Sequence, residues 1–277
     1  MSRYLLCTDL DRTLIPNGKQ PESPGARDRF RQLVSREEIS LVYVTGRHRA
    51  LIEQAIREYD LPLPDFAISD VGSTIYRVDS SGWEQWDEWD VHIAPDWRGK
   101  SHDELYQLLS VYAALRLQEQ EKQNRHKLSF YVPLDSDVQT LMAEAGERLK
   151  QAEIKANLIW SIDEQADVGL LDVLPASANK LHAIEFLMQR LGYTRENTVF
   201  SGDSGNDLDV VRSHIHSVLV ANSDTGVKQQ AISDSDADTL YIARGGYLGM
   251  NGNYSAGILE GMAHFSQEID AWLRHPV

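Results

Sequence analysis

Short apolar runs recur along this chain, separated by segments in which apolar and polar residues alternate at helical spacing. Buried strands are predicted where β-branched and other apolar residues run together without polar interruption. Such runs lie at residues 4–7, 39–44, 65–69, 128–132, 158–162, 168–174, 198–201 and 217–220. A further extended stretch, residues 71–76, follows the third run closely. These runs supply strands for a large sheet.

Amphipathic segments lie between the apolar runs, and they predict helices with one apolar face. The helices are predicted at residues 24–38, 48–59, 103–122, 136–150, 180–191, 207–213, 227–233 and 255–273. Strands that alternate with helices are typical of an α/β protein with a doubly wound, mostly parallel sheet. We therefore expect a Rossmann-like core of this kind.

The character of the chain changes near residue 79. Residues 79–102 are rich in tryptophan and acidic residues, and predicted strands and helices resume after them. Tryptophan rings can stack on sugars, but they more often fill the core of a small domain. We expect a compact α/β insertion at 79–176, between two parts of the core at 1–78 and 177–277.

Composition narrows the range of partners. The chain has 277 residues, 42% of them hydrophobic, which is enough for a large core or for two domains. A net charge of −15 makes nucleic acid and anionic membranes unfavourable partners. An anionic substrate would therefore need a local cation or a basic site.

Cellular location is predicted from what the sequence lacks. The single cysteine, Cys7, cannot form an intramolecular disulfide, and we expect it to be a buried thiol. No apolar run approaches membrane-spanning length, and Met1-Ser2-Arg3-Tyr4 lacks the apolar region of a signal peptide. We expect a cytoplasmic protein.

Two aspartates, Asp9 and Asp11, directly follow the first predicted strand. The carboxyl ends of strands in open α/β sheets line the crevice where ligands bind. Two carboxylates this close repel, and a divalent cation such as Mg²⁺ would relieve that repulsion. The alternative is a pair of solvated loop acids.

Two other segments offer groups for binding an anion. Thr45-Gly46-Arg47 ends the second strand and provides a hydroxyl, a flexible backbone and a guanidinium, although an ordinary strand-to-helix turn would look similar. Lys180 begins a predicted helix, where a cation is unfavourable for the helix dipole. That cost favours a role for Lys180 in holding an anion, against the alternative of a solvated lysine.

The segment Gly202-Asp203-Ser204-Gly205-Asn206-Asp207 follows another buried strand. It packs two carboxylates and an amide between glycines, which a plain turn could also do. Together with Asp9 and Asp11, it would supply the further acidic ligand that a Mg²⁺ site needs.

The order of these motifs resembles the haloacid dehalogenase (HAD) superfamily of phosphohydrolases. Asp9-Leu10-Asp11-Arg12-Thr13 matches its first motif, Thr45 its second, Lys180 its third and residues 202–207 its fourth. The insertion resembles the type C2 cap of that superfamily. Residues 71–76, 126–131, 172–175, 179–180 and 255–261 further resemble the sucrose-phosphate phosphatases.

The resemblance implies a Mg²⁺-dependent phosphatase that hydrolyses a sugar phosphate, with sucrose-6-phosphate as the expected substrate. It implies that Asp9 attacks phosphorus to form an aspartyl-phosphate and that Asp11 protonates the leaving sugar oxygen. Mg²⁺ would be bound by Asp9, Asp203 and the backbone carbonyl of Asp11, with Asp207 orienting these ligands. The expected phosphate-binding residues are Thr45, Gly46, Lys180 and Asn206. The expected sugar contacts are Arg47, Ser73, Lys127 and Asn179.

Other functions remain open at this point. The substrate could be another phosphorylated disaccharide or glycoside, such as mannosylfructose phosphate or glucosylglycerol phosphate. A phosphomutase shares the aspartyl-phosphate, and a non-catalytic sugar-phosphate-binding regulatory subunit could share the fold. The resemblance also suggests an association with a glycosyltransferase of the sucrose-phosphate synthase type.

Overall fold

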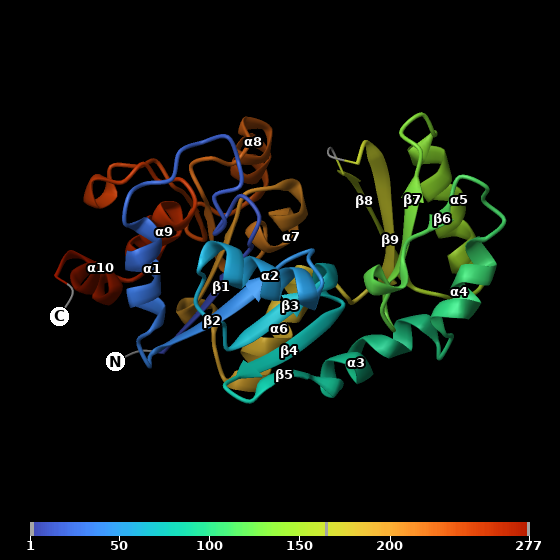
Figure 1. The fold of residues 1–277 in the computed structure, drawn as a ribbon, viewed down its shortest axis with the longest axis horizontal. Coiled ribbons are helices and arrows are strands. Elements are labelled where there is room, and N and C mark those ends of the chain that lie inside the picture. The colour runs from blue at the N-terminus through green and yellow to red at the C-terminus, as the bar shows by residue number, and fades with distance from the viewer. Residues whose placement is uncertain (1–2, 164–165, 276–277) are drawn as a thin grey trace. The chain divides into compact units, whose positions relative to one another are not determined.

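A computed structural model describes residues 3–163 and 166–275 of the chain (Figure 1). Met1 and Ser2, at the segment predicted to lack a signal peptide, lie outside the described residues. The chain divides into two compact units. The first unit comprises the chain up to Gln85 and from Lys180 onward, and the second runs from Trp86 to Asn179.

The first unit is built on an eight-stranded sheet in the order β12-β11-β10-β1-β2-β3-β4-β5. The strands are β1 (Tyr4–Thr8), β2 (Ile39–Val44), β3 (Phe66–Ser69), β4 (Thr74–Asp79), β5 (Gly82–Gln85), β10 (Thr198–Gly202), β11 (His216–Leu219) and β12 (Leu240–Ile242). The six strands from β12 to β3 are parallel, and β4 and β5 are antiparallel. The predicted α/β fold with a mostly parallel sheet is confirmed.

Helices cover both faces of this sheet. They are α1 (Ala26–Val34), α2 (Arg49–Tyr59), α6 (Lys180–Leu191), α7 (Leu208–Val211), α8 (Thr225–Asp234), α9 (Ser255–Phe265) and α10 (Gln267–Arg274). Leu5, Leu6 and Cys7 of β1 are all fully buried, although successive strand residues point to opposite faces. Both faces of the central strand are therefore covered, and Cys7 is the buried thiol that we expected.

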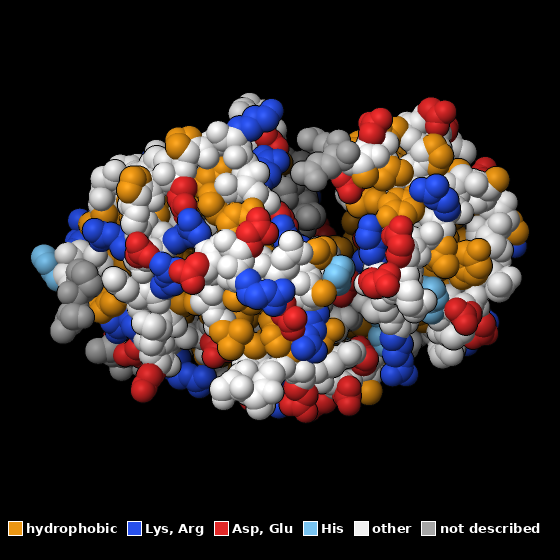
Figure 2. Space-filling view, viewed as in Figure 1, with side chains coloured by type: hydrophobic (Ala, Val, Ile, Leu, Met, Phe, Trp, Pro, Cys, Tyr) orange, Lys and Arg blue, Asp and Glu red, His pale blue; other side chains and the backbone are white. Residues whose placement is uncertain are grey.

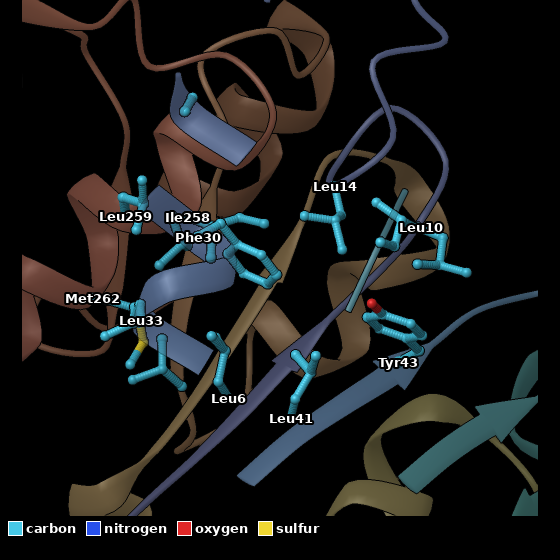
Figure 3. Packing of buried hydrophobic residues seen from close by; sticks show 14 of the residues in the cluster. Leu6, Leu10, Leu14, Phe30, Leu33, Leu41, Tyr43, Ile258, Leu259 and Met262 are labelled. Atoms are coloured by element: carbon cyan, nitrogen blue, oxygen red, sulfur yellow. The ribbon is translucent and has the colours of Figure 1, made fainter. Parts of the chain in front are cut away.

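One core cluster joins α1 and α9 to the middle of the sheet. Phe30 of α1, Leu6 of β1, Leu41 of β2 and Ile258 of α9 belong to it, and all are almost fully buried (Figure 3). Apolar side chains from segments far apart in sequence thus hold the first and last parts of the unit together.

The second unit contains a four-stranded antiparallel sheet in the order β6-β7-β9-β8. Its strands are β6 (Arg116–Leu117), β7 (Leu128–Val132), β8 (Ala156–Asp163) and β9 (Val168–Pro175), and its helices are α3 (Asp87–Ile93), α4 (His102–Leu109) and α5 (Val138–Gln151). Side chains of α4, α5, β7 and β9 share one apolar core. Trp89 and Trp97 are fully buried, as core tryptophans should be.

Two long predicted helices are interrupted in the structure. The helix predicted at 103–122 ends at Leu109, because Arg116 and Leu117 instead pair with Tyr131 and Phe130 as strand β6. The helix predicted at 255–273 is broken at Ser266, whose side chain accepts a hydrogen bond from the Ile269 amide and caps α10. Sheet pairing and a local cap override the apolar periodicity in these places.

The bounds of the second unit also differ from those predicted for the insertion. Residues 82–85 form β5 and pair with β4, so they belong to the large sheet rather than to the insertion that we expected from residue 79. The return crossing lies at Asn179 rather than at 176, immediately before Lys180.

Charged side chains of both signs lie on the surface of the molecule. Acidic and basic side chains are interspersed over the face drawn in Figure 2. Among the described helices, none is both long enough and apolar enough to cross a membrane. A cytoplasmic location stays a prediction.

Candidate active site

The ends of two neighbouring strands bring Asp9 and Asp203 to one edge of the large sheet. Strands β1 and β10 are parallel with Thr8 opposite Ser201, and the Asp9 amide donates to the Ser201 carbonyl at 2.9 Å. Asp9 and Asp203 follow these strands, and both side chains are buried. The register of the sheet therefore places at its carboxyl edge the acids that the sequence singled out.

The segment after β10 folds so that Asp207 turns back toward Asp203. One oxygen of Asp207, Oδ2, accepts hydrogen bonds from the amides of Asp203 (3.0 Å) and Ser204 (3.1 Å). A Cβ atom on Gly202 would lie 2.6 Å from the Asp207 carboxylate, so only glycine fits at that position. Packing of the Asp207 carboxylate therefore accounts for the first glycine of the 202–207 motif.

Lys180 joins this acidic group from the first residue of α6. Its Nζ donates to Asp207 Oδ1 at 2.7 Å, to Asp9 Oδ2 at 3.0 Å and to Asn206 Oδ1 at 3.2 Å. Burial alone would lower the pKa of Lys180, but the charges of Asp207 and Asp9 raise it above the ordinary value. Lys180 is therefore a fixed ammonium cation within a buried group of acids.

Asp9 and Asp203 hold protons more tightly than exposed carboxylates do. Burial raises the pKa of Asp9 to about 7, with Asp207 and Asp203 adding to the effect and Lys180 opposing it. Burial and the charge of Asp207 raise the pKa of Asp203 to about 6. Without a further cation, the negative charge at this edge is only partly compensated.

The residues present fit a divalent cation. Oxygen atoms of Asp9, Asp203 and Asp207 lie within 4.8 Å of one another. Thr13 Oγ1 donates to Asp203 Oδ1 at 3.2 Å, whereas Asp203 Oδ2 is buried and accepts no hydrogen bond. Several carboxylate oxygens, one of them without a donor, are the ligands that a hard cation such as Mg²⁺ prefers.

Asp11 lies outside the buried group and is held by different partners. Arg47 donates to both of its oxygens, from Nε at 2.8 Å and from Nη2 at 2.7 Å, and Asn17 Nδ2 donates at 2.7 Å. Burial would raise the pKa of Asp11, but the hydrogen bonds and charge of Arg47 outweigh it and lower that pKa. Arg47, which we expected to contact the sugar, is thus engaged with Asp11 in this structure.

Thr45 and Gly46 extend past the same edge of the sheet. They follow β2, which runs parallel to β1 with Tyr43 opposite Thr8, so by continuation of that register they reach the level of Leu10 and Asp11. Thr45 is buried, and its hydroxyl accepts a hydrogen bond from the Arg47 amide at 3.2 Å. Gly46 is exposed. Their role in holding phosphate stays a prediction.

The other three residues that we expected to contact the sugar are divided between the two units. Ser73 is buried in the first unit next to β4, and Lys127 and Asn179 belong to the second unit. Lys127 is buried, donates to the Lys122 carbonyl at 3.2 Å and lies 3.8 Å from Asp172. The roles of these three residues stay predictions.

Sequence reasoning assigned no role to three residues that contact the site. Thr13 donates to Asp203, Arg12 Nε lies 3.3 Å from Asp203 Oδ2, and Asn17 donates to Asp11. Arg12 and Thr13 stand within the first motif, and Asn17 within the turn that follows it. Only their position beside the two aspartates could have indicated their involvement.

Comparisons with known proteins agree with this geometry. The sequence profile of the family described as sucrose-6F-phosphate phosphohydrolase matches residues 2–266. A protein of Nitrosococcus oceani, named as a HAD-like hydrolase, is 53% identical over 274 residues, which are 98% of this chain and 74% of that one. Sucrose-phosphatase 1 of Nicotiana tabacum is 29% identical over 279 residues, covering 96% of this chain but only 60% of its own length.

Solved structures show the same fold. The sucrose-phosphatase of Synechocystis sp. PCC6803, solved in complex with sucrose and phosphate, has a TM-score of 0.75 at 26% identity. The match covers 96% of this chain and 98% of that one. A haloacid dehalogenase-like hydrolase of Bacillus subtilis has a TM-score of 0.65 at 17% identity, which supports the fold alone.

The match of the family profile over nearly the whole chain, together with the four motifs gathered at one sheet edge, identifies the chain at the level of its family. It belongs to the sucrose-6F-phosphate phosphohydrolases of the haloacid dehalogenase superfamily, and it is a phosphoric monoester hydrolase.

Proposed function

We propose that this protein is a Mg²⁺-dependent phosphatase that hydrolyses sucrose-6-phosphate to sucrose and phosphate. The contact of Lys180 with both Asp9 and Asp207, beside Asp203, is the observation that carries the proposal. A buried carboxylate next to a fixed ammonium cation and a divalent-cation site suits attack on a phosphate dianion.

Asp9 is the proposed nucleophile. Its carboxylate attacks phosphorus, the bond from phosphorus to the sugar oxygen breaks, and an aspartyl-phosphate forms. Asp11, which Arg47 holds as a carboxylate in this structure, first takes up a proton from solvent, gives it to the leaving sugar oxygen, and later takes a proton from the water that hydrolyses the aspartyl-phosphate. Both carboxyl groups are thereby regenerated in one turnover.

The remaining groups hold the phosphoryl oxygens and balance their charge. Lys180 and Asn206 offer an ammonium and an amide, and Thr45 and Gly46 offer a hydroxyl and a backbone amide, as transition-state contacts. Asp9, Asp203 and the carbonyl of Asp11 would hold Mg²⁺, with Asp207 orienting these ligands. When bound, the cation would offset the negative charge of the phosphoryl oxygens.

We assign substrate choice to the second unit, as a cap. Its residues Lys127 and Asn179, with Arg47 and Ser73 of the first unit, are the proposed sugar contacts. Support comes from the similarity of both units, over 96% of this chain, to a phosphatase solved with sucrose and phosphate.

Glucosylglycerol phosphate is the second candidate substrate, with mannosylfructose phosphate as a related one. A glucosylglycerol-phosphate synthase of Pseudomonas anguilliseptica is 27% identical to this chain over 266 residues. That match covers 94% of this chain and 30% of the synthase. Because a region similar to this chain is part of a sugar-phosphate synthase in that protein, we also propose that this protein associates with a glycosyltransferase of the sucrose-phosphate synthase type.

A panel of phosphorylated sugars tests the proposal. Release of inorganic phosphate should be measured with Mg²⁺, and we expect the highest kcat/KM for sucrose-6-phosphate. Asp9→Asn is the matched control, because it keeps the shape of the side chain but removes the nucleophile. Phosphate release from no sugar phosphate, or undiminished release by Asp9→Asn, would overturn the proposal. A higher kcat/KM for glucosylglycerol phosphate would select the second candidate.

A further inference from the structure

The two oxygens of Asp203 have different neighbours. Oδ1 accepts the hydrogen bond of Thr13, whereas Oδ2, which accepts none, lies 3.3 Å from Nε of Arg12. The other end of the same guanidinium lies 3.5 Å from Asp224. Arg12 therefore bridges a buried acid and an exposed acid, and the Arg12 side chain is itself 41% exposed.

The backbone of Arg12 is held in place on both sides. Its φ angle of 57° is in the left-handed region, which an arginine adopts only when its surroundings require it. The Arg12 amide donates to Asn17 Oδ1 at 2.8 Å, and the Arg12 carbonyl accepts from Asn222 Nδ2 at 2.6 Å. The side chain thus starts from a fixed point between Asp203 and Asp224.

We propose that Arg12 is a competing counter-ion for Asp203, and that Asp224 is the acid that draws it away. This inference rests on the proposed Mg²⁺ dependence and concerns how tightly the cation is held. A guanidinium beside Asp203 Oδ2 repels a divalent cation that binds the same carboxylate. Asp224 lowers this repulsion because it attracts the other end of the guanidinium.

The consequence is a metal affinity set by two charges that need not bind the metal themselves. Removal of the Arg12 charge should tighten Mg²⁺ binding by about two- to tenfold, since Arg12 is partly exposed and its charge is partly screened. Removal of the Asp224 charge should weaken binding about two- to fivefold, because Arg12 then acts on Asp203 alone. In the Arg12 variant Asp224 has no guanidinium to attract, so the further loss of the Asp224 charge in the double variant should leave the affinity equal to that of the Arg12 variant.

Calorimetric titration of the whole, EDTA-stripped chain with MgCl₂ tests this directly, without an activity assay. The variants are Arg12→Gln, Asp224→Asn and the double variant, measured at pH 8 in low and high salt. The Asp224 side chain makes no cap hydrogen bond to α8, so Asp224→Asn removes a charge without removing a helix cap. Arg98→Gln is the matched control, because Arg98 pairs with Glu153 in the second unit, and it should leave the affinity unchanged.

Tighter binding by Arg12→Gln and weaker binding by Asp224→Asn, with both differences shrinking at high salt, would support the inference. Equal or weaker binding by Arg12→Gln, or unchanged binding by Asp224→Asn, would overturn it while leaving the proposed function in place. Failure of the unaltered chain to bind Mg²⁺ at all would instead contradict the proposed metal dependence. Should Arg12→Gln fail to fold, Asp224→Asn alone still decides the outcome.

Discussion

Lys180 and Asp207, which are 27 residues apart in sequence, form a buried ion pair of 2.7 Å that also involves Asp9. The pair joins the start of α6 to the segment after β10, so the ammonium reaches the end of β1 only because these elements converge at one sheet edge. Breaking a buried pair from one side leaves the other charge without compensation.

Replacement of this cation should therefore affect both stability and activity. We expect Lys180→Met to lower the free energy of unfolding by about 3–5 kcal/mol at pH 8, because Asp9 and Asp207 lose their counter-charge. The loss should be smaller at pH 5.5, where Asp9, whose pKa is raised by burial, can take up a proton. Phosphatase activity should fall by at least about 10²-fold, as for loss of a charge-stabilising group. Urea unfolding at the two pH values and a phosphate-release assay measure these effects.

Lys150→Met is the control for this substitution. Lys150 is 81% exposed and lies 4.0 Å from Glu147, so its removal should change stability by less than about 0.5 kcal/mol. A cost for Lys180→Met no greater than that of Lys150→Met would contradict the view that Lys180 compensates buried charge.

The sequence predicted the residues of the site wherever a motif of charged or polar residues followed a predicted strand or began a predicted helix. The residues that meet at the sheet edge, Asp9, Lys180, Asp203 and Asp207, were all named from motifs that follow predicted strands or begin a helix. Parallel strands align their carboxyl ends, so motifs at strand ends converge whatever their separation in sequence. The antiparallel strand β5 was missed because Gly82–Gln85 is short and polar and gives no apolar run.

The raised pKa of Asp203 also predicts how the stability of the metal-free protein changes with pH. The pKa of folded Asp203 is raised to about 6, from an ordinary 3.8, so the folded state holds this proton more tightly than the unfolded state. Stability from the neutral carboxyl is therefore present at pH 4 and lost as the pH rises through about 6. The loss for this group could reach about 3 kcal/mol, at 1.4 kcal/mol per pH unit of pKa difference.

Comparison with Asp203→Asn isolates this contribution. We expect the metal-free protein in EDTA to lose stability between pH 4.5 and 7.5, and the variant to lose less because its amide does not titrate. Saturating Mg²⁺ should restore stability most strongly at the upper end of this range. Parallel curves for the two proteins would contradict the raised pKa of Asp203.

Asp11 should matter most when the leaving oxygen is a poor leaving group. Asp11→Asn should lower kcat on a sugar phosphate by about 10²–10⁴-fold, the usual range for a lost general acid. With p-nitrophenyl phosphate the loss should be much smaller, because p-nitrophenolate leaves without a proton. Measurement of kcat for both substrates tests the role of Asp11, and equal losses would contradict it.

Arg47 should act on the same step through Asp11. It donates to both Asp11 oxygens and fixes the position of that carboxyl, so Arg47→Met should lower kcat on the sugar phosphate by loosening Asp11, even though the pKa of Asp11 rises when the guanidinium is lost. The double variant with Asp11→Asn should lose little more kcat than Asp11→Asn alone, because both changes disable the same proton-donating pair. If Arg47→Met changes only KM, and the losses in kcat/KM of the two single variants multiply in the double variant, the result would instead favour the contact of Arg47 with the sugar that we first predicted.

Side-chain pairings of this kind could not be predicted from the sequence. Thr45-Gly46-Arg47 indicated an anion site, but nothing in its pattern shows that Arg47 would pair with Asp11 rather than with a substrate. Arg12 was equally ambiguous, because its two acidic neighbours lie about 200 residues away. Motif patterns predict which residues meet more readily than they predict how charges within the group are shared.

The glycines of α9 offer a test of the packing that supports the site. A Cβ atom on Gly261 would lie 2.2 Å from a methyl carbon of Val218 in β11, so α9 packs on the sheet more closely than an alanine allows. We expect Gly261→Ala to lower the free energy of unfolding by about 1–3 kcal/mol through overpacking, despite the better helix propensity of alanine.

Gly226→Ala in α8 is the matched control in the same unit, because a Cβ atom there meets nothing within 4 Å. That control should change stability by no more than about 1 kcal/mol, in the stabilising direction, because alanine lowers the entropy of the unfolded chain. Urea unfolding of the two variants distinguishes these cases, and a stabilising Gly261→Ala would show that the contact of α9 with β11 is looser than the structure has it.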